Sequence, residues 1–136
     1  MANWYGTSRS NYFHVKDEVQ FRQWVDTRGI SIIQSREDPT LFALHPDDST
    51  GDGSWPSYDM DADAEVDFLH ELSQHLAKNE VAVLLTAGAE KPRYITGEAL
   101  AVNDKGMVVD LSLFDIYQKA ARTFQVPLGS ITHAEY

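Results

Sequence analysis

The sequence predicts an α+β fold with a ferredoxin-like βαββαβ core, extended by a β-hairpin and a C-terminal helix. The chain has 136 residues, near the commonest size of one domain, and 43% of them are hydrophobic. Short apolar runs alternate with amphipathic segments, and Gly, Pro or Asn-Asp turns separate them. We therefore expect residues 1–136 to form a single domain.

Six segments supply the predicted core, in the order strand, helix, strand, strand, helix, strand. They span residues 11–15, 17–27, 30–34, 41–44, 63–78 and 80–87. The first helix has clear end signals, because Asp17 can cap it, Gln20 completes a capping box and Gly29 can terminate it. The second helix is predicted from its apolar stripe, which consists of Val66, Leu69, Leu72 and Leu76. The strands are predicted from their runs of apolar residues.

The remaining segments predict the additions to this core. The turn at 88–92 predicts that residues 93–102 return as a hairpin partner of the preceding strand. A short strand follows at 107–110, and Ser112, with an acid three residues later, predicts the capped start of a third helix. From about residue 127 we expect a flexible tail.

Negative charge is concentrated in one part of the chain. The net charge is −10, and residues 37–77 contain eleven acids but no Lys or Arg. The rest of the chain has ten acids and eleven bases. This asymmetry indicates a directed field that opposes direct binding to nucleic acid or to an anionic membrane and favours a basic partner protein.

A long acidic loop over residues 45–60, with the segment after it, holds the candidate partner-binding residues. Its acids lie beside large apolar side chains, which are typical interface anchors. The candidates are Asp47, Asp48, Asp52, Trp55, Tyr58, Asp59, Asp61 and Asp63. Two plainer interpretations stay open: Trp55 tucks back to cover the sheet, or the later acids stabilise the N-terminus of the second helix.

Known motifs for metal, cofactor or catalytic sites are not matched, and we expect none of these sites. Because the chain has no cysteine, disulfides, thiolate zinc sites and thiol nucleophiles are excluded. Residues 59–65 alternate acids as in a calcium loop, but Ala64 and His70 stand where that loop needs Gly and Glu. His70 and His75 are one residue too far apart for the H-E-x-x-H zinc motif, and we interpret both as surface residues. No signal peptide or membrane-length apolar run is evident, so we expect a cytoplasmic protein.

The opening residues carry one resemblance. Residues 1–4 (MANW), followed by residues 11–15 (NYFHV), are similar to small uncharacterised proteins of plasmids and phages, some of which are ferredoxin-like. The resemblance covers about the first tenth of the chain. It implies an accessory role in a mobile element, and the acidic segment adds the hypothesis of an anti-defence or immunity type.

Three functions of different classes follow as hypotheses. The first is an acidic binding or inhibitor domain that acts on a basic partner protein. The second is a small-ligand or enzymatic domain, with a pocket lined by His14, His45, Tyr94 or Glu98. The third is a module that forms a homodimer through an exposed sheet edge, with residues 41–44 or 107–110 as candidate edges.

Overall fold

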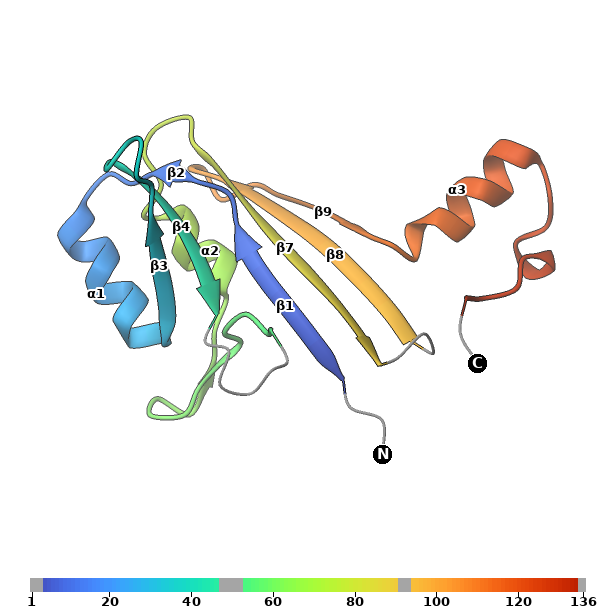
Figure 1. Cartoon of the computed structure of the whole chain (residues 1–136), viewed down its shortest axis with the longest axis horizontal. Coiled ribbons are helices and arrows are strands. Elements are labelled where there is room, and N and C mark those ends of the chain that lie inside the picture. The colour runs from blue at the N-terminus through green and yellow to red at the C-terminus, as the bar shows by residue number, and fades with distance from the viewer. Residues whose placement is uncertain (1–3, 47–52, 91–93, 135–136) are drawn as a thin grey trace.

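The computed structural model describes residues 4–46, 53–90 and 94–134, which form a mixed α+β structure (Figure 1). Its helices are α1 (Glu18–Arg28), α2 (Phe68–Ser73), α3 (Asp115–Phe124) and the 3-10 turn η2 (Leu128–Ser130). Its strands are β1 (Tyr5–Ser10), β2 (Phe13–His14), β3 (Ile30–Gln34), β4 (Leu41–Pro46), β5 (Tyr58–Asp59), β6 (Ala64–Glu65), β7 (Val81–Glu90), β8 (Tyr94–Asn103) and β9 (Val108–Ser112).

Two antiparallel sheets meet where the chain passes from β1 to β2. One sheet has the strand order β1-β7-β8-β9, and the other has the order β2-β4-β3. Asn11 and Tyr12 separate β1 from β2, and the Ser10 hydroxyl accepts a hydrogen bond from the Leu44 N–H at 2.8 Å across the junction. The mixed α+β class is as predicted, but a ferredoxin-like topology is not confirmed, since the described strands fall into a four-stranded sheet, a three-stranded sheet and the two-stranded β5-β6 sheet.

The strand β1 is absent from the prediction because its inward-facing residues are polar. Ser8 and Ser10 are buried, so β1 lacks the apolar alternation that signals a strand. Hydrogen bonds replace apolar contacts at these positions: Ser8 donates to the Gly53 carbonyl, and Ser10 donates to the Asn11 carbonyl at 2.7 Å. A buried hydroxyl that is satisfied in this way is tolerated inside a sheet.

The first helix is confirmed with its end signals. The Asp17 carboxylate accepts the Gln20 N–H at 3.1 Å, and α1 begins at the next residue, Glu18. Gly29 adopts the left-handed conformation with φ of 66°, and its N–H donates to the Asp26 carbonyl. Both ends therefore depend on bonds within a few residues, which sequence patterns report well.

The second helix is much shorter than predicted. Asp67 caps α2 by accepting the His70 N–H at 3.1 Å, and the preceding residues form the β5–β6 hairpin instead of helix. In that hairpin, the Asp59 carboxylate accepts the N–H groups of Asp61 and Ala62, and this local turn competes with helical bonding. The interpretation that the acids before residue 67 stabilise a helix N-terminus is therefore wrong.

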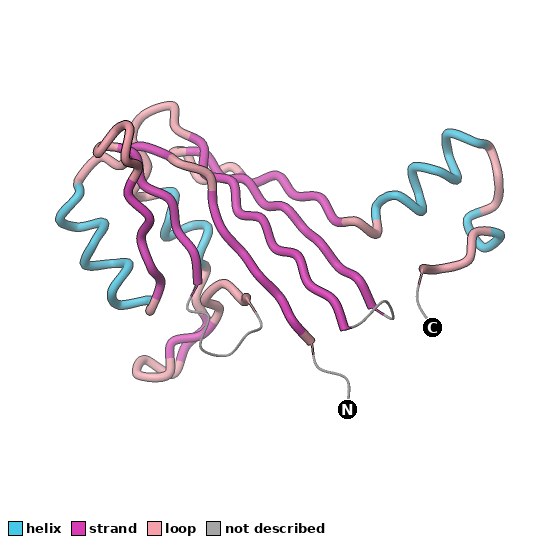
Figure 2. The backbone as a smooth tube through the Cα atoms, in the orientation of Figure 1, coloured by secondary structure: helices cyan, strands magenta, loops and turns pink. Residues whose placement is uncertain are grey.

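The main core lies between the sheets and the helices α1 and α2. Phe21 of α1 is fully buried, with its ring edge-on to Phe13 at 6.0 Å and tilted against Phe42 at 5.7 Å. Leu72 of α2 and Leu84 of β7 extend the same cluster. The opposite face of the β1-β7-β8-β9 sheet has no helix against it in Figure 2, and α3 leaves the end of β9 away from the sheets.

The two predicted sheet edges have different outcomes. Residues 41–44 lie in β4, which is the middle strand of its sheet, so that prediction is wrong. The strand predicted at 107–110 is β9, which does form an edge. In the described part of the chain, no helix is long and apolar enough to span a bilayer.

The residues predicted to form a flexible tail contain some structure where they are described. Beyond α3, the turn η2 is followed by a return of the chain towards the helix. The Ala134 N–H donates to the Tyr117 hydroxyl at 2.7 Å, and the ring of His133 lies 4.7 Å from the ring of Tyr117.

Candidate binding cleft

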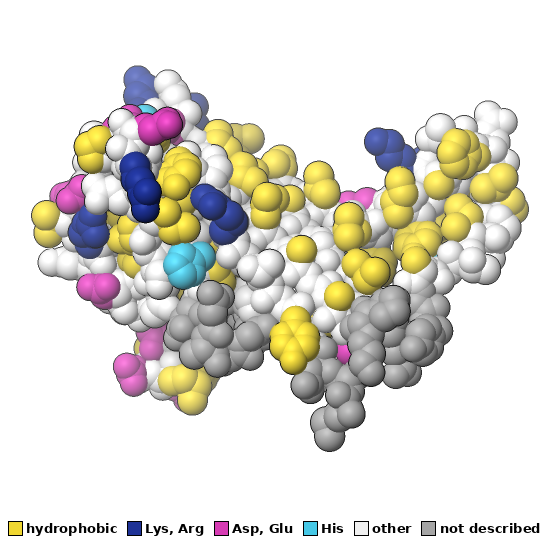
Figure 3. Space-filling view, in the orientation of Figure 1, with side chains coloured by type: hydrophobic (Ala, Val, Ile, Leu, Met, Phe, Trp, Pro, Cys, Tyr) yellow, Lys and Arg dark blue, Asp and Glu magenta, His cyan; other side chains and the backbone are white. Residues whose placement is uncertain are grey.

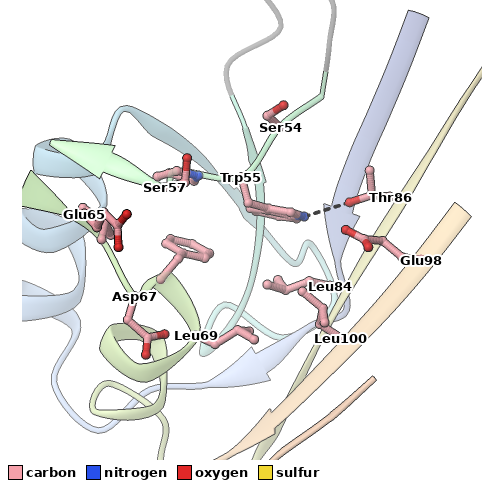
Figure 4. A pocket seen from close by; sticks show the side chains of 13 residues that line it. Ser54, Trp55, Ser57, Glu65, Asp67, Leu69, Leu84, Thr86, Glu98 and Leu100 are labelled. Atoms are coloured by element: carbon pink, nitrogen blue, oxygen red, sulfur yellow. Dashed lines mark hydrogen bonds between the residues drawn. The ribbon is translucent and has the colours of Figure 1, made fainter. Parts of the chain in front are cut away.

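A cleft of about 760 Å³ opens between the segment leading to β5 and the inner face of the larger sheet (Figure 4). One wall consists of residues 54–57, and another consists of the end of β6 and the start of α2. The sheet contributes Leu84 and Thr86 from β7, which lie opposite Leu100 and Glu98 of β8. The cleft therefore combines three parts of the chain that are far apart in sequence.

Trp55 forms the apolar wall of the cleft, and a hydrogen bond and a stacking contact fix its side chain. Its indole N–H donates to the Thr86 hydroxyl at 3.2 Å, and its ring stacks on Phe68 with the centroids 5.5 Å apart. The stack continues from Phe68 to Trp24 at 5.2 Å and from Trp24 to His75 at 4.8 Å. Trp55 thus packs back against the core. This confirms the alternative interpretation of the sequence, in which Trp55 covers the sheet.

The backbone before Trp55 is held against β1, which sets the position of this wall. Gly53 is buried with φ of 69°, a conformation that favours glycine. A Cβ at this residue would lie 2.7 Å from backbone atoms of Gly6 and Thr7, so only glycine permits the approach. The Ser8 hydroxyl bonds to the Gly53 carbonyl and lies 2.9 Å from the Thr86 hydroxyl, which connects this contact to the wall.

Three carboxylates line the cleft. Glu65 and Asp67 lie on the side of β6 and α2, whereas Glu98 lies on the strand side near Trp55 (Figure 4). No Lys, Arg or His is among the residues that line the cleft. Carboxylates next to apolar walls produce a focused negative potential, because the walls lower the local dielectric. The arrangement is suited to hold a cation.

His75 ends the aromatic stack and is half-buried, so the interpretation of this residue as a surface histidine holds only in part. Burial lowers the pKa of its imidazole, and the positive charge of Lys16 lowers it further, while Glu71 and Asp17 act in the opposite direction. His70 is exposed, as expected. Among the described residues, no group of three or more His, Asp or Glu side chains is arranged to hold a metal ion.

Arg28, at the end of α1, holds α2 and the β5–β6 hairpin together beside the cleft. Its guanidinium donates to both oxygens of Glu71, at 2.8 and 3.0 Å, and to Asp59 at 2.9 Å. The hydrogen bond from Arg28 is the main cause that keeps the pKa of Glu71 below its ordinary value. The pKa of Asp59 is lowered first by the Ala62 N–H and then by Arg28.

The predicted partner-binding residues fall into three groups. Asp47, Asp48 and Asp52 lie outside the described residues. Trp55 lines the cleft. The β5–β6 hairpin and its turn contain the other four, of which Asp59 is bonded to Arg28, Tyr58 is bonded through its hydroxyl to Asp63, and Asp61 is exposed.

Of the residues named for a small-ligand pocket, only Glu98 lines this cleft. His14 is bonded to Glu80 at 2.7 Å and lies 3.7 Å from Asp38, and His45 is next to the Pro46 carbonyl. Glu65, Asp67 and Phe68 also line the cleft, and they were not predicted from the sequence. Their spacing indicated a helix, and no local pattern places them opposite β8.

Comparison of the chain with protein-family models, with curated proteins and with solved structures finds no match. The geometry of the cleft and the charge of the chain are therefore the features that indicate a function.

Proposed function

We propose that this protein is a binding domain for a basic partner protein and that its cleft receives a lysine or arginine side chain of that partner. The observation that carries the proposal is the set of three carboxylates, Glu65, Asp67 and Glu98, around an aromatic wall with no basic residue in the lining. A cation gains from both features, since carboxylates accept charge-assisted hydrogen bonds and aromatic faces attract positive charge.

The surface beside the cleft supports a macromolecular partner. The β5–β6 hairpin carries Asp61, Asp63 and Glu65 as exposed acids, and Met60 in its turn is 83% exposed. A flexible apolar side chain among acids is suited to contact the aliphatic stem of a basic residue. The net charge of −10 adds long-range attraction for a basic surface. An inhibitor role towards a basic enzyme, and an accessory role in a mobile element, stay predictions within this proposal.

A test uses a peptide of three arginines as the probe and the matching citrulline peptide as its neutral control. Isothermal titration at low salt is expected to detect the arginine peptide only, with an affinity that falls as salt is added. Glu98→Gln is expected to weaken binding about two- to fivefold, which corresponds to one partly solvated charge contact. Glu37→Gln, which removes the same charge from an exposed position outside the cleft, is the matched control.

The outcomes separate the parts of the proposal. If neither peptide binds, the proposal of a basic partner is wrong. Equal effects of Glu98→Gln and Glu37→Gln would show that binding depends on net charge and that the cleft is not the site.

The volume of the cleft also favours a second candidate, a site for a small cationic ligand. At about 760 Å³ it lies within the range of small-molecule sites, roughly 300–1,000 Å³. Methylguanidinium tests this candidate in the same titration. Binding of methylguanidinium as tight as that of the peptide would favour the small-ligand function over the partner protein.

A further inference from the structure

In the described part of the chain, no helix packs on the outer face of the β1-β7-β8-β9 sheet, and this face is largely apolar. Register places Arg9, Leu85, Ala99 and Leu111 in one row across the four strands, on the side opposite the buried Leu84. Leu85 is 52% exposed and Leu111 is 59% exposed. The described strands place no Asp or Glu on this face, although the chain has a net charge of −10.

Small residues in the middle of this face form a groove. Ala87, Gly97 and Ala99 lie between larger side chains that include Leu85 and Leu111, and the groove has a volume of about 480 Å³. Small side chains allow another element to approach a sheet closely. Figure 3 shows hydrophobic side chains spread over these strands and continuing onto α3. Monomeric proteins seldom expose large apolar surfaces.

The helix α3 presents a second apolar surface, which the following residues cover only in part, by the contact of His133 and Ala134 with Tyr117. Its apolar residues recur along one side, at Ile116, Tyr117, Ala120, Ala121 and Phe124, and no residue of α3 is buried. Ile116 is 59% exposed and Phe124 is 70% exposed. The helix start is well defined, because the Asp115 carboxylate accepts the Ser112 N–H and the Ser112 hydroxyl accepts the Phe114 N–H. A ten-residue helix is marginal alone in water, so its apolar side needs a partner.

The connection between β9 and α3 directs the helix away from its own sheet. Only Leu113 and Phe114 separate the two elements, and the Leu113 N–H donates to the Gly97 carbonyl at 2.9 Å. The Leu113 side chain packs over Gly97, and a Cβ built at Gly97 would lie 3.0 Å from Cδ1 of Leu113. This contact fixes the link on the sheet, and α3 continues outward from it in Figure 1.

We propose that two copies of this chain form a two-fold dimer in which the apolar side of each α3 packs into the groove on the outer sheet face of the other copy. Each copy carries both a groove and an α3. The two-fold arrangement therefore contains the same helix-in-groove contact twice, as an isologous interface requires. Covering the exposed apolar side chains of sheet and helix in both copies would bury on the order of 1,000 Å² or more, which reaches the size of a specific interface.

A second copy fits this surface better than the basic partner proposed for the cleft. Glu98 borders the groove, but strand alternation places its side chain on the cleft face of the sheet, and Arg9 on the groove border would repel a cation. The cleft and the groove also lie on opposite faces of the sheet, since Leu84 and Leu100 line the first and Leu85 and Ala99 line the second. The dimer is therefore independent of the proposed binding function.

Cysteine cross-linking tests the exchange directly, because the chain has no cysteine of its own. Ala99→Cys places a thiol in the groove, and Ala120→Cys places one on the apolar side of α3. Mixing the two variants under mild oxidation is expected to give a disulfide-linked heterodimer. Gln118→Cys, which lies on the polar side of the same helix, replaces Ala120→Cys in the control and is expected to give at least fivefold less heterodimer. Equal yields for the two helix positions would overturn the proposal.

A double variant distinguishes exchange between copies from closure within one chain. If Ala99→Cys with Ala120→Cys forms only an intramolecular disulfide at every protein concentration, α3 covers its own sheet and the proposed dimer is wrong.

Light scattering gives an independent measurement, in which the wild type is expected at twice the mass of one chain. Phe124→Asp is expected to give the single-chain mass with an unchanged circular dichroism of the sheets, while Thr123→Asp leaves the dimer intact. A wild type that is monomeric at about 100 μM would overturn the proposal, because an interface of this size is expected to hold at that concentration.

Discussion

The guanidinium of Arg28 donates two parallel hydrogen bonds to the carboxylate of Glu71, from Nε at 2.8 Å and from Nη2 at 3.0 Å. The oxygen that accepts from Nε also accepts the indole N–H of Trp24 at 2.7 Å. Both ionic side chains are partly buried, so this contact is less solvated than a fully exposed surface salt bridge. The end of α1 is thereby fixed to α2 and, through Asp59, to the β5–β6 hairpin.

Glu71→Gln is expected to lower the free energy of unfolding by about 1–3 kcal/mol at pH 7, because Arg28 and Trp24 lose a charged acceptor. The pKa of Glu71 is below its ordinary value of 4.5 in the folded protein, so its stabilisation is complete above that pH and is lost as pH falls through the folded pKa. Urea unfolding at pH 7 and pH 2.5 measures this. An equal loss at both pH values would contradict the assignment, and Glu37→Gln serves as the exposed control.

His75 predicts a separate pH dependence closer to neutrality. Its pKa is lowered from 6.5, mainly by burial, so the unfolded chain binds more protons than the folded one. The neutral ring contributes stability above pH 6.5, and that contribution is lost as pH falls through the folded pKa. His75→Phe and His75→Gln are both expected to flatten the unfolding free energy between pH 7.5 and 5.5. Only the Phe variant keeps the stack on Trp24 and should stay near wild-type stability at pH 7.5. An unchanged pH slope in both variants would rule His75 out as the source.

Local bonds explain which elements could be predicted from the sequence. The ends of α1 depend on Asp17, Gln20 and Gly29, which interact with their own neighbours. The β7–β8 hairpin was likewise predicted from its apolar runs and from the turn between them. In contrast, β1 is polar on its buried side, and its two serines are satisfied by Gly53 and by residues of other strands. Apolar alternation is a local pattern, so it cannot predict a strand whose buried side is stabilised by hydrogen bonds to residues far away in the sequence.

The cleft could be predicted only in part, because its residues meet through tertiary contacts. Trp55 was recognised as a large side chain in a polar loop, with packing on the sheet as one interpretation. Its partner Thr86 is 31 residues away, and the pairing of Thr86 with Glu98 depends on the β7–β8 register. The excess of acid in the middle of the chain was visible in the sequence. Which of those acids are already bonded, as Asp59 and Glu71 are to Arg28, was not.

The hydrogen bond between Trp55 and Thr86 gives a prediction about the rigidity of the cleft wall. Trp55→Phe keeps an aromatic ring on Phe68 but removes the donor, and Thr86→Val removes the acceptor. Each single change is expected to cost about 0.5–1.5 kcal/mol of unfolding free energy. The double variant is expected to cost less than the sum, with a coupling of at least 0.5 kcal/mol, roughly the smallest value that contacting residues show. Strict additivity in urea unfolding would mean that the bond does not stabilise the folded state.

Gly88 tests the pairing of β1 with β7, on which the back of the cleft depends. It lies opposite Gly6 in the ladder, and a Cβ at this position would lie 2.8 Å from the Tyr5 carbonyl oxygen and would overlap the ring of Trp4. The Trp4 ring can move, but the Tyr5 carbonyl is part of the strand backbone. Gly88→Ala is therefore expected to lower the free energy of unfolding by about 1–3 kcal/mol, as for other overpacked positions.

Gly129→Ala is the matched control for this change, because no described atom lies within 4 Å of a Cβ built at Gly129. It is expected to stay within about 0.5 kcal/mol of wild type. Adding Trp4→Ala to Gly88→Ala removes the ring overlap and leaves the backbone contact, so it should not restore wild-type stability. If urea unfolding gives the same midpoint for Gly88→Ala and Gly129→Ala, the close approach of β1 to β7 at Gly88 is wrong.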